Sequence, residues 1–448
     1  LQPPSAALHR CRLFVAAYNR TYGDLMVGEY NATTDEVAWQ FVDGVPLGAP
    51  VVGGPSGPRG GVEEPGPDVG GYLDMAVSPQ GVLHIVYSDK VSLSLKYMRV
   101  DGTNLTRMTL DAQRETGVYP SIALDPSTGA PRVVYLTRRD ESGGMPMAYL
   151  KMAAAHDATP GSAADFVFHT LAEEDLTRVN CEGGCPTGQA CQERMEPLLD
   201  VCVDEAASCS PSCSATGGEF CSASGCRPMV AGSNTRRIPE GPGIWSATTV
   251  RTDGKPVTVV YNTFTSSLVA YTTQSGDPVD SPTARFDERV LAGAVDDAGS
   301  WPGIAVDPSG VVHVVYVHAT TKALTHVQLA GNLSVTSTDV VDDASRDNGM
   351  FSDVHHLAEP AIVLRSDGVA VIAYQDSTTG ELWMAVESGN GMYTRTVLAG
   401  GLTGTAYDGF YGFSTDMVAQ GPGAPVISTF RYNVDLMQTS NLVFFHAP

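Results

Sequence analysis

Polar residues of several chemical types follow the same kind of sequence element, an apolar run that ends in or near a tyrosine. If these runs are neighbouring strands, the polar side chains lie on one face. Carboxylates, guanidinium groups, an amide and an imidazole at equivalent positions would form an asymmetric site for a polar ligand. Loop ends are polar in most folds, so an ordinary exposed role stays equally open. The candidate ligand-binding residues of this set are Arg20, Asp89, Arg138, Asn262, His318, Asp376 and Arg431.

A second set of positions precedes an apolar run and combines an acidic residue, a glycine and an aromatic residue. The candidate ligand-binding aromatics are Tyr72, Tyr119, Trp245, Trp301 and Tyr411. Rings that converge on one opening could stack on sugar faces or on methyl groups. Repeat signatures usually maintain a fold. We therefore favour a packing corner, in which the glycine permits the turn and the ring fills space between repeats.

Two adjacent histidines with nearby aspartates could bind a metal. Neighbouring residues of an extended strand point apart, so we expect only one of His355 and His356 to be a ligand. The candidate pair is His355 with Asp353. The acidic loops could equally hold calcium or another divalent cation. No D-x-[DN]-x-[DN]-G loop is present, so we favour a solvated acidic loop, and no other cofactor is indicated.

Eight of the nine cysteines form two groups of four with similar spacing. The groups are Cys181, Cys185, Cys191 and Cys202, then Cys209, Cys213, Cys221 and Cys226. The segment has too few large apolar residues for a core, so we expect disulfides within each group. Zinc is the alternative, but the segment has no C-x2-C pair and no histidine. Disulfides predict an oxidising location: secreted, periplasmic or on the cell surface.

The elements that position these residues are internal repeats. Seven units of roughly 45–55 residues read as short strands with turns between them, four strands in most units, which is the size of a propeller blade. The sequence therefore predicts an all-β, seven-bladed β-propeller, with six blades as the alternative. Blades 1–3 are expected in residues 1–175, the cysteine-rich insert in 176–232 and blades 4–7 in 233–448. The last unit stops after its third strand, and the first unit could lend it an edge strand.

Composition excludes several classes of function. The chain has 27 Lys+Arg against 50 Asp+Glu, a net charge of −23. This charge disfavours nucleic acid and anionic membrane surfaces as partners. No apolar run is long enough to span a bilayer. Gly and Pro are abundant, with 47 and 29 residues, as expected for a turn-rich β protein.

Some segments resemble the sialidase-type propellers and the related BNR-repeat polysaccharide lyases and hydrolases. The segment from Asp297 to Trp301, DAGSW, is similar to their Asp-box but one residue short, and it precedes a first strand instead of following a third. Arg237-Ile-Pro resembles the tripeptide whose arginine contacts the substrate carboxylate in sialidases. The resemblance implies an arginine triad, for which Arg138, Arg237 and Arg431 are the nominees. His84 and His313 match the histidine of the "GxxHVVY" blades.

The leading functional hypothesis is a secreted or cell-surface propeller that binds a glycan or a protein on its loop face. The second hypothesis is a glycan-active enzyme, sialidase-like hydrolase or polysaccharide lyase, for which Asp89 and Asp376 are the nearest candidates for a carboxylate pair. The third is a structural surface or matrix component. The sequence carries no G-x-S-x-G, H-E-x-x-H or P-loop motif.

Overall fold

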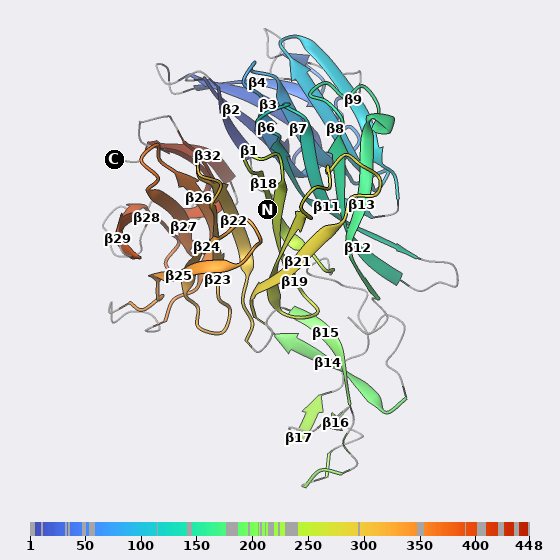
Figure 1. Cartoon of the computed structure of the whole chain (residues 1–448), viewed down its shortest axis with the longest axis vertical. Coiled ribbons are helices and arrows are strands. Elements are labelled where there is room, and N and C mark those ends of the chain that lie inside the picture. The colour runs from blue at the N-terminus through green and yellow to red at the C-terminus, as the bar shows by residue number, and fades with distance from the viewer. Residues whose placement is uncertain are drawn as a thin grey trace.

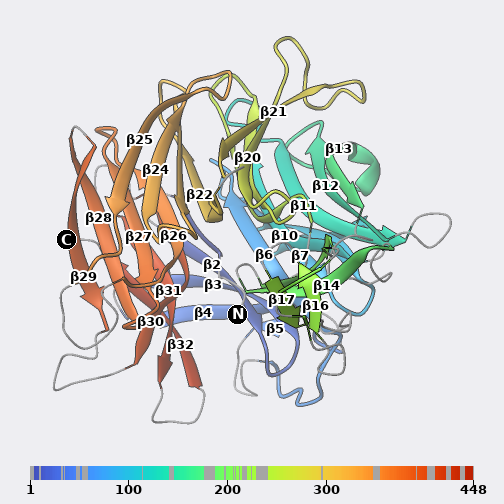
Figure 2. The same ribbon diagram turned by 90° about the horizontal axis from the view of Figure 1, so that it is seen from below.

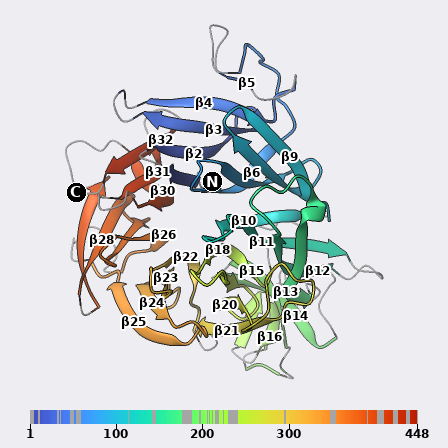
Figure 3. The same ribbon diagram turned by 45° about the horizontal axis from the view of Figure 1, so that its top comes forward.

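Each repeat folds as an antiparallel meander because its strands are short and separated by tight turns. In the computed structural model, seven such sheets stand around one axis as the blades of a β-propeller (Figures 1 and 3). The prediction of an all-β, seven-bladed propeller is confirmed, and the six-bladed alternative is wrong. The structure describes residues 5–446 apart from 10–11, 32–33, 35, 47–50, 53–58, 114, 141–145, 176–186, 196–197, 205, 207, 211, 214–218, 223–224, 229–240, 294–295, 347–353, 390, 401–408, 420–424 and 434–438.

Consecutive strands form each blade, with the innermost strand first. Blade 1 contains β1 (Ser5–His9), β2 (Arg12–Asn19), β3 (Asp24–Asn31), β4 (Glu36–Asp43) and β5 (Val51–Val52). Blade 2 contains β6 (Val69–Val77), β7 (Leu83–Asp89), β8 (Ser94–Asp101) and β9 (Asn104–Asp111). Blade 3 contains β10 (Thr116–Leu124), β11 (Pro131–Asp140), β12 (Pro146–Ala155) and β13 (Phe166–Asp175), with the 3-10 turn η1 (Ala163–Asp165) before β13.

The second half of the ring repeats this order. Blade 4 contains β18 (Ile244–Val250), β19 (Pro256–Asn262), β20 (Ser267–Thr273) and β21 (Phe286–Ala292). Blade 5 contains β22 (Ser300–Val306), β23 (Val312–Val317), β24 (Leu324–Leu329) and β25 (Val335–Asp342). Blade 6 contains β26 (Leu357–Leu364), β27 (Ala370–Asp376), β28 (Glu381–Gly389) and β29 (Met392–Ala399). Blade 7 contains β30 (Phe410–Val418), β31 (Val426–Asn433) and β32 (Thr439–His446).

The hydrophobic core lies between the blades. The second strands β7, β19 and β27 are buried along their whole length, as expected of strands covered on both faces. The fourth strands β21 and β29 are exposed at most positions. Between blades 1 and 2, for example, Leu25 and Val42 pack in one cluster with Leu73 and Tyr87.

Innermost strands begin, second strands end and fourth strands end on the same side of the ring, which we call the mouth face. A glycine with positive φ stands where several inner strands start: Gly70, Gly117, Gly299 and Gly412. Each lies against the third or second strand of the preceding blade. A Cβ on Gly299 would lie 2.6 Å from Leu268 Cβ. The glycine part of the repeated motif is therefore a close approach of two backbones.

We expect Gly299→Ala to destabilise the fold by about 1–3 kcal/mol more than Gly276→Ala, because it adds a steric clash to the conformational cost. Gly276 also has a positive φ, 88° against 115° at Gly299, but a Cβ added there would have no atom beyond its chain neighbours within 4 Å. Urea unfolding of the two variants measures the difference. Equal destabilisation would show that the backbone conformation alone explains the glycine.

The ring closes without a shared strand among the described residues. The first repeat keeps β1 to β5 in its own sheet, and the last blade has three strands. The expectation that the first unit lends an edge strand is therefore wrong for this part of the chain. Instead, the carboxylate of Asp416 in blade 7 accepts a hydrogen bond from the backbone N–H of Ala6 in blade 1, at 2.7 Å.

The cysteine-rich insert lies between β13 and β18 and projects from the ring (Figures 1 and 2). It contains β14 (Gln189–Met195), β15 (Leu198–Asp204), β16 (Glu219–Ser222) and β17 (Gly225–Pro228), paired as two hairpins. Disulfides join Cys209 to Cys221 and Cys213 to Cys226. Pairing within the second group is confirmed; Cys181 and Cys185 lie outside the described residues. Within the described chain, no helix is long and apolar enough to cross a membrane.

Candidate functional site at the channel mouth

The innermost strand of six blades contains a non-glycine residue with a left-handed backbone at one equivalent position. In blade 2, Tyr72 stands two residues before Asp74, where pairing with β7 resumes after a register shift. The φ values lie between 44° and 54°, and such backbones cost about 1–3 kcal/mol each, so the recurrence is a built feature of the repeat. The six bulge residues are Tyr72, Tyr119, Trp245, Trp301, Glu359 and Ser414. The equivalent residue of blade 1 lies outside the described chain.

Four of the bulge residues form an arc of touching aromatic rings. The ring centroids are 4.9 Å apart for Tyr72 and Tyr119, 6.3 Å for Tyr119 and Trp245, and 4.8 Å for Trp245 and Trp301. All four side chains are half-buried. Tyr119 and Trp245 also pack against the buried cluster that contains Leu136 and Ile244, so the arc both fills the corner between blades and keeps ring surface exposed at the mouth.

Tyr411, the fifth aromatic expected at this position, lies elsewhere. It stands three residues before Ser414, the bulge residue of blade 7, and is buried between blades 6 and 7. Its ring packs against Phe445, with centroids 6.0 Å apart. Tyr411 therefore does not join the arc.

Glu359 continues the arc beyond Trp301 and is a functional candidate that the sequence reasoning missed. Its half-buried carboxylate accepts a hydrogen bond from the backbone N–H of Ser414. Burial raises the pKa of Glu359 above its usual value, and this hydrogen bond lowers the pKa only in part. The signal was in the sequence, because the fifth repeat begins at Glu359 as others begin at Tyr72 or Trp301.

The channel behind the arc contains a cavity of about 330 Å³ with one polar and one apolar wall. On the polar wall, each side chain accepts a hydrogen bond from the next blade's backbone. Asp74 accepts from the N–H of Ile122 at 2.8 Å, and Ser121 accepts from the N–H of Thr248 at 3.0 Å. The apolar wall has Ala247, Gly303 and Ala361 at the corresponding positions.

The two channel carboxylates have raised pKa values. Burial raises the pKa of Asp416 to about 7, and the nearby charge of Asp74 adds to the effect. Burial also raises the pKa of Asp74, against the lowering effect of the hydrogen bond from Ile122. Both carboxylates accept hydrogen bonds from the backbone of a neighbouring blade, so we assign them a structural role and not a role in ligand binding.

Most of the polar residues that follow second strands hold the turn after the strand. Their side chains accept hydrogen bonds from backbone N–H groups two or three residues further on, as in an Asx-turn. The distance from the first of these backbone nitrogens to the side-chain acceptor is 3.0 Å at Asp89, 2.9 Å at Asn262, 3.3 Å at His318 and 3.1 Å at Asp376. Asn19 makes the same contact in blade 1, at 3.0 Å, so Arg20 is one residue beyond this position.

Arg138 and Arg431, the two nominated arginines within the described residues, each have a contact of their own. Arg138 lies 3.4 Å from a carboxylate oxygen of Glu115. The guanidinium of Arg431 lies 5.7 Å from the ring centroid of Tyr411. Arg237 lies outside the described residues. Asp297, the acid of the Asp-box-like segment, accepts a hydrogen bond from Tyr261 Oη of the preceding blade at 2.7 Å.

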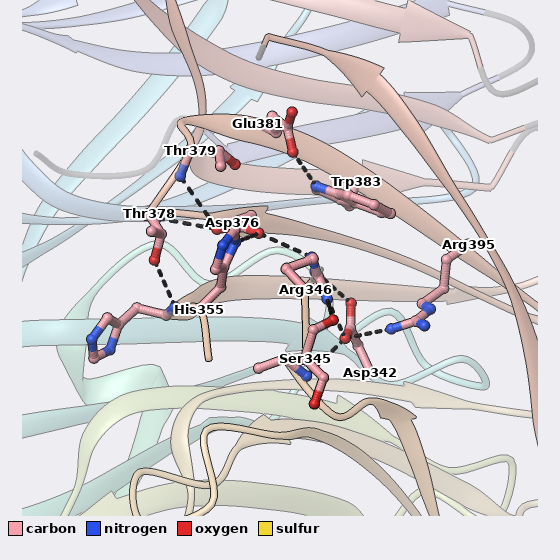
Figure 4. A network of polar contacts seen from close by, with 12 residues as sticks. Asp342, Ser345, Arg346, His355, Asp376, Thr378, Thr379, Glu381, Trp383 and Arg395 are labelled. Atoms are coloured by element: carbon pink, nitrogen blue, oxygen red, sulfur yellow. Dashed lines mark hydrogen bonds and ion pairs between the residues drawn. The ribbon is translucent and has the colours of Figure 1, made fainter. Parts of the chain in front are cut away.

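His355 belongs to a buried ionic network between blades 5 and 6 (Figure 4). Its Nδ1 lies 2.7 Å from Asp376 Oδ2, and both side chains are almost completely buried. Arg346 lies 3.4 Å from Asp376 and forms two 2.9 Å hydrogen bonds with Asp342. Asp353, the expected second metal ligand, lies outside the described residues, so the metal site stays a prediction.

Within the described chain, the grouping whose spacing fits a metal ion consists of Cys209, Cys213 and Cys226. All three are disulfide-bonded. Asp89 and Asp376, the carboxylates nominated for hydrolysis, have separate partners: Lys96 lies 2.9 Å from Asp89, whereas Asp376 contacts His355.

Three blade boundaries share a contact that we call the Tyr–Asp latch. The fourth strand of one blade ends in an aspartate at the mouth face, and a tyrosine in the next blade's second strand donates to it. The latches are Asp43–Tyr87 (2.7 Å), Asp111–Tyr135 (2.7 Å) and Asp342–Tyr374 (2.6 Å). Cations reinforce them, as Lys151 does at 3.0 Å from Asp111.

No family model and no curated protein matches this chain. Among solved structures, the polysaccharide lyase Uly1 is similar over 99% of this chain and 90% of its own, at 10% identity and a TM-score of 0.42. The SapL1 lectin in complex with alpha methyl fucoside is similar over 90% and 96%, at 10% identity and a TM-score of 0.38. The β-propeller domain of the Trilobed protease from Pyrococcus furiosus is similar over 100% and 96%, at 7% identity and a TM-score of 0.42.

The propeller fold that the resemblance implied is confirmed by the ring of blades itself. At such low identities and TM-scores, the likenesses say nothing about which ligand this chain takes.

Proposed function

We propose that this protein is a secreted or cell-surface propeller that binds a glycan at its channel mouth. The observation that carries the proposal is the arc of Tyr72, Tyr119, Trp245 and Trp301, whose rings are in mutual contact on strained backbone positions. Strain of this kind persists where the surrounding structure enforces it and clusters at ligand sites. Aliphatic side chains could fill a corner between blades, but they would not offer flat ring faces.

The chemistry of the mouth suits a sugar. The C–H face of a pyranose ring packs on an aromatic face, and its hydroxyl groups need polar partners at the edge of that surface. Glu359 lies next along the ring of blades and supplies a carboxyl group. The two disulfides of the insert support an oxidising location.

Glu359 also favours a second candidate function, a glycan-active enzyme. A carboxyl group whose pKa is raised by burial is suited to act as a general acid. Glycoside hydrolysis usually needs a second carboxylate at a fixed separation. Among the six bulge residues Glu359 is the one carboxyl group, so binding is the better supported function.

A glycan array followed by calorimetry tests the proposal. We expect Trp301→Ala to weaken binding by at least about tenfold, which corresponds to about 1.4 kcal/mol. Phe168→Ala is the matched control, because Phe168 is an exposed aromatic on the outer strand β13. Thermal melts check that both variants fold. Binding that survives both Trp301→Ala and Trp245→Ala would contradict the proposal.

Product analysis of any bound glycan separates the two functions. Cleavage that is lost in Glu359→Gln while binding persists would establish the enzyme. Binding without cleavage leaves the binding function as stated.

A further inference from the structure

The last blade exposes a strand whose sequence suits the interior of a sheet. In β32 the consecutive residues Leu442, Val443, Phe444 and Phe445 are apolar on both faces of the strand, yet all four are half-exposed. The equivalent third strand β20 is buried along its whole length, and β24 nearly so. The difference follows from the sheet order, because blade 7 ends at β32 among the described residues, whereas the other blades have at least four strands.

The free edge of β32 also lacks the charges that usually protect sheet edges. Native proteins place charged residues on exposed edge strands to prevent pairing with other chains. Each fourth strand of the other six blades carries at least one charged residue, as β21 does with Asp287, Glu288 and Arg289. The sequence of β32, TSNLVFFH, contains no Asp, Glu, Lys or Arg.

A groove of about 1620 Å³ follows this edge between blades 7 and 1. The five consecutive residues 440–444 line it, which requires the groove to follow the strand, since successive side chains point to opposite faces. Its other wall includes Trp39 of blade 1. A Cβ on the cross-strand partner Gly28 would lie 2.9 Å from the Trp39 ring, so the glycine makes room for the indole.

The boundary between blades 7 and 1 lacks the parts of a Tyr–Asp latch. The cross-strand pair of Ser5 and Ala16 in blade 1 is equivalent to the pair of Asp74 and Val86 in blade 2. Ala17, the next residue, therefore occupies the position of Tyr87. The cross-strand partner of Ala17 is Met26, whereas the partner of Tyr87 in blade 2 is Lys96. Both Ala17 and Met26 line the groove. The groove wall is therefore apolar at the position where three other boundaries have a Tyr–Asp latch.

We infer that this groove binds an extended segment of another polypeptide, which pairs with β32 as the fourth strand of blade 7. Main-chain hydrogen bonds to the free edge would supply affinity, and the groove would select the side chains on one face. Within the described part of the chain, blade 7 has one strand fewer than blade 6 and two fewer than blade 1. A single strand fits this recess better than the edge of a second propeller.

Charge defines one end of the partner. A strand antiparallel to β32 has its carboxyl end at the mouth face, where Arg20 lines the groove. Arg20 is exposed and forms no ion pair with another described residue, in a chain with a net charge of −23. The partner segment is therefore apolar on the side that faces the groove and acidic at its carboxyl end.

Three labelled peptides of eight residues provide the probes, with the sequences of residues 36–43, 104–111 and 335–342 of this chain. Each is a natural fourth strand that ends in aspartate. Fluorescence polarisation with the whole protein should give saturable binding for at least one peptide. N-methylation of alternate amides, which removes main-chain donors, should weaken it by at least about tenfold, the equivalent of one or two lost hydrogen bonds. Arg20→Ala should weaken it by about two- to fivefold, as for an exposed ion pair.

Controls separate this site from the mouth. Trp39→Ala should abolish peptide binding, and Trp301→Ala should leave it unchanged, with thermal melts to check that both fold. Failure of all three peptides to bind the wild-type protein would overturn the inference. So would equal binding of the N-methylated peptides, or sedimentation that shows a dimer split by Phe444→Lys. None of these results bears on glycan binding at the arc.

Discussion

Replacement of Asp342 by alanine is expected to lower the free energy of unfolding by about 3–5 kcal/mol, the usual cost of removing one partner from a buried ionic network. The side chain of Asp342 is fully buried. Arg346 and Tyr374 donate hydrogen bonds to it, and Arg395 lies 2.5 Å away. The variant removes the buried acceptor that these donors share at the boundary of blades 5 and 6 (Figure 4). Urea unfolding followed by circular dichroism measures the loss.

The pH dependence of this variant has a defined sign. Burial raises the pKa of Asp342, but hydrogen bonds from Arg346 and Tyr374 outweigh that effect and hold the pKa below its usual 3.8. The contribution of the carboxylate is therefore complete above pH 3.8 and is lost as the pH falls through the lower, folded-state pKa. The difference in the free energy of unfolding between the wild type and Asp342→Ala should be constant near neutral pH and should decrease in stronger acid.

The exposed pair of Arg365 and Asp367 gives the control. Their side chains are 44% and 51% exposed, so Asp367→Ala should cost less than about 1 kcal/mol. A similar cost for Asp342→Ala would mean that the network does not link the two blades energetically.

The fold was predictable because its signals are local and repeated. Strand-turn-strand patterns such as that from Trp301 to Leu329 define a blade by themselves, and seven copies define a ring. The closure was not predictable, because it depends on one long-range contact. The link from Asp416 to Ala6 joins residues 410 positions apart, and no local pattern marks its two ends.

The aromatic arc was only partly predictable. Tyr72, Tyr119, Trp245 and Trp301 share a motif that the sequence displays directly. In blade 7 an aromatic, Tyr411, stands near the motif, but the bulge shifts the register so that Ser414 takes the position. A bulge changes which residue of the strand occupies a given position, and the residue type alone does not predict that shift. Alignment of the repeats on their second strands would have identified both Glu359 and Ser414.

The polar residues after the second strands show the limit of composition as a guide. Asp89, Asn262 and Asp376 were equally consistent with ligand contacts and with turns. Their side chains bond to the turn backbone, a role that short polar side chains fill in any protein. Only the three-dimensional arrangement shows which acceptors are already occupied.

One buried group, His326, should contribute a loss of stability as the pH falls into the mildly acid range. This side chain is fully buried in β24, where its Nδ1 lies 2.6 Å from Tyr393 Oη of blade 6 and its Nε2 lies 3.0 Å from His313. Burial lowers the pKa of His326 to about 3, and the neighbouring His313 adds to the effect. At this site the folded protein thus binds fewer protons than the unfolded chain below pH 6.5, so the stability that the site contributes is lost as the pH falls.

Each pH unit below 6.5 should cost about 1.4 kcal/mol from this group, so the loss is about 2–3 kcal/mol near pH 4.5. His326→Asn keeps a polar side chain but does not titrate. The stability advantage of the wild type over this variant should therefore shrink by that amount between pH 7 and about pH 4.5. Asp416, whose raised pKa of about 7 acts in the opposite direction, is present in both proteins and cancels. An unchanged stability difference between the wild type and His326→Asn over this pH range would mean that burial does not lower the pKa of this imidazole.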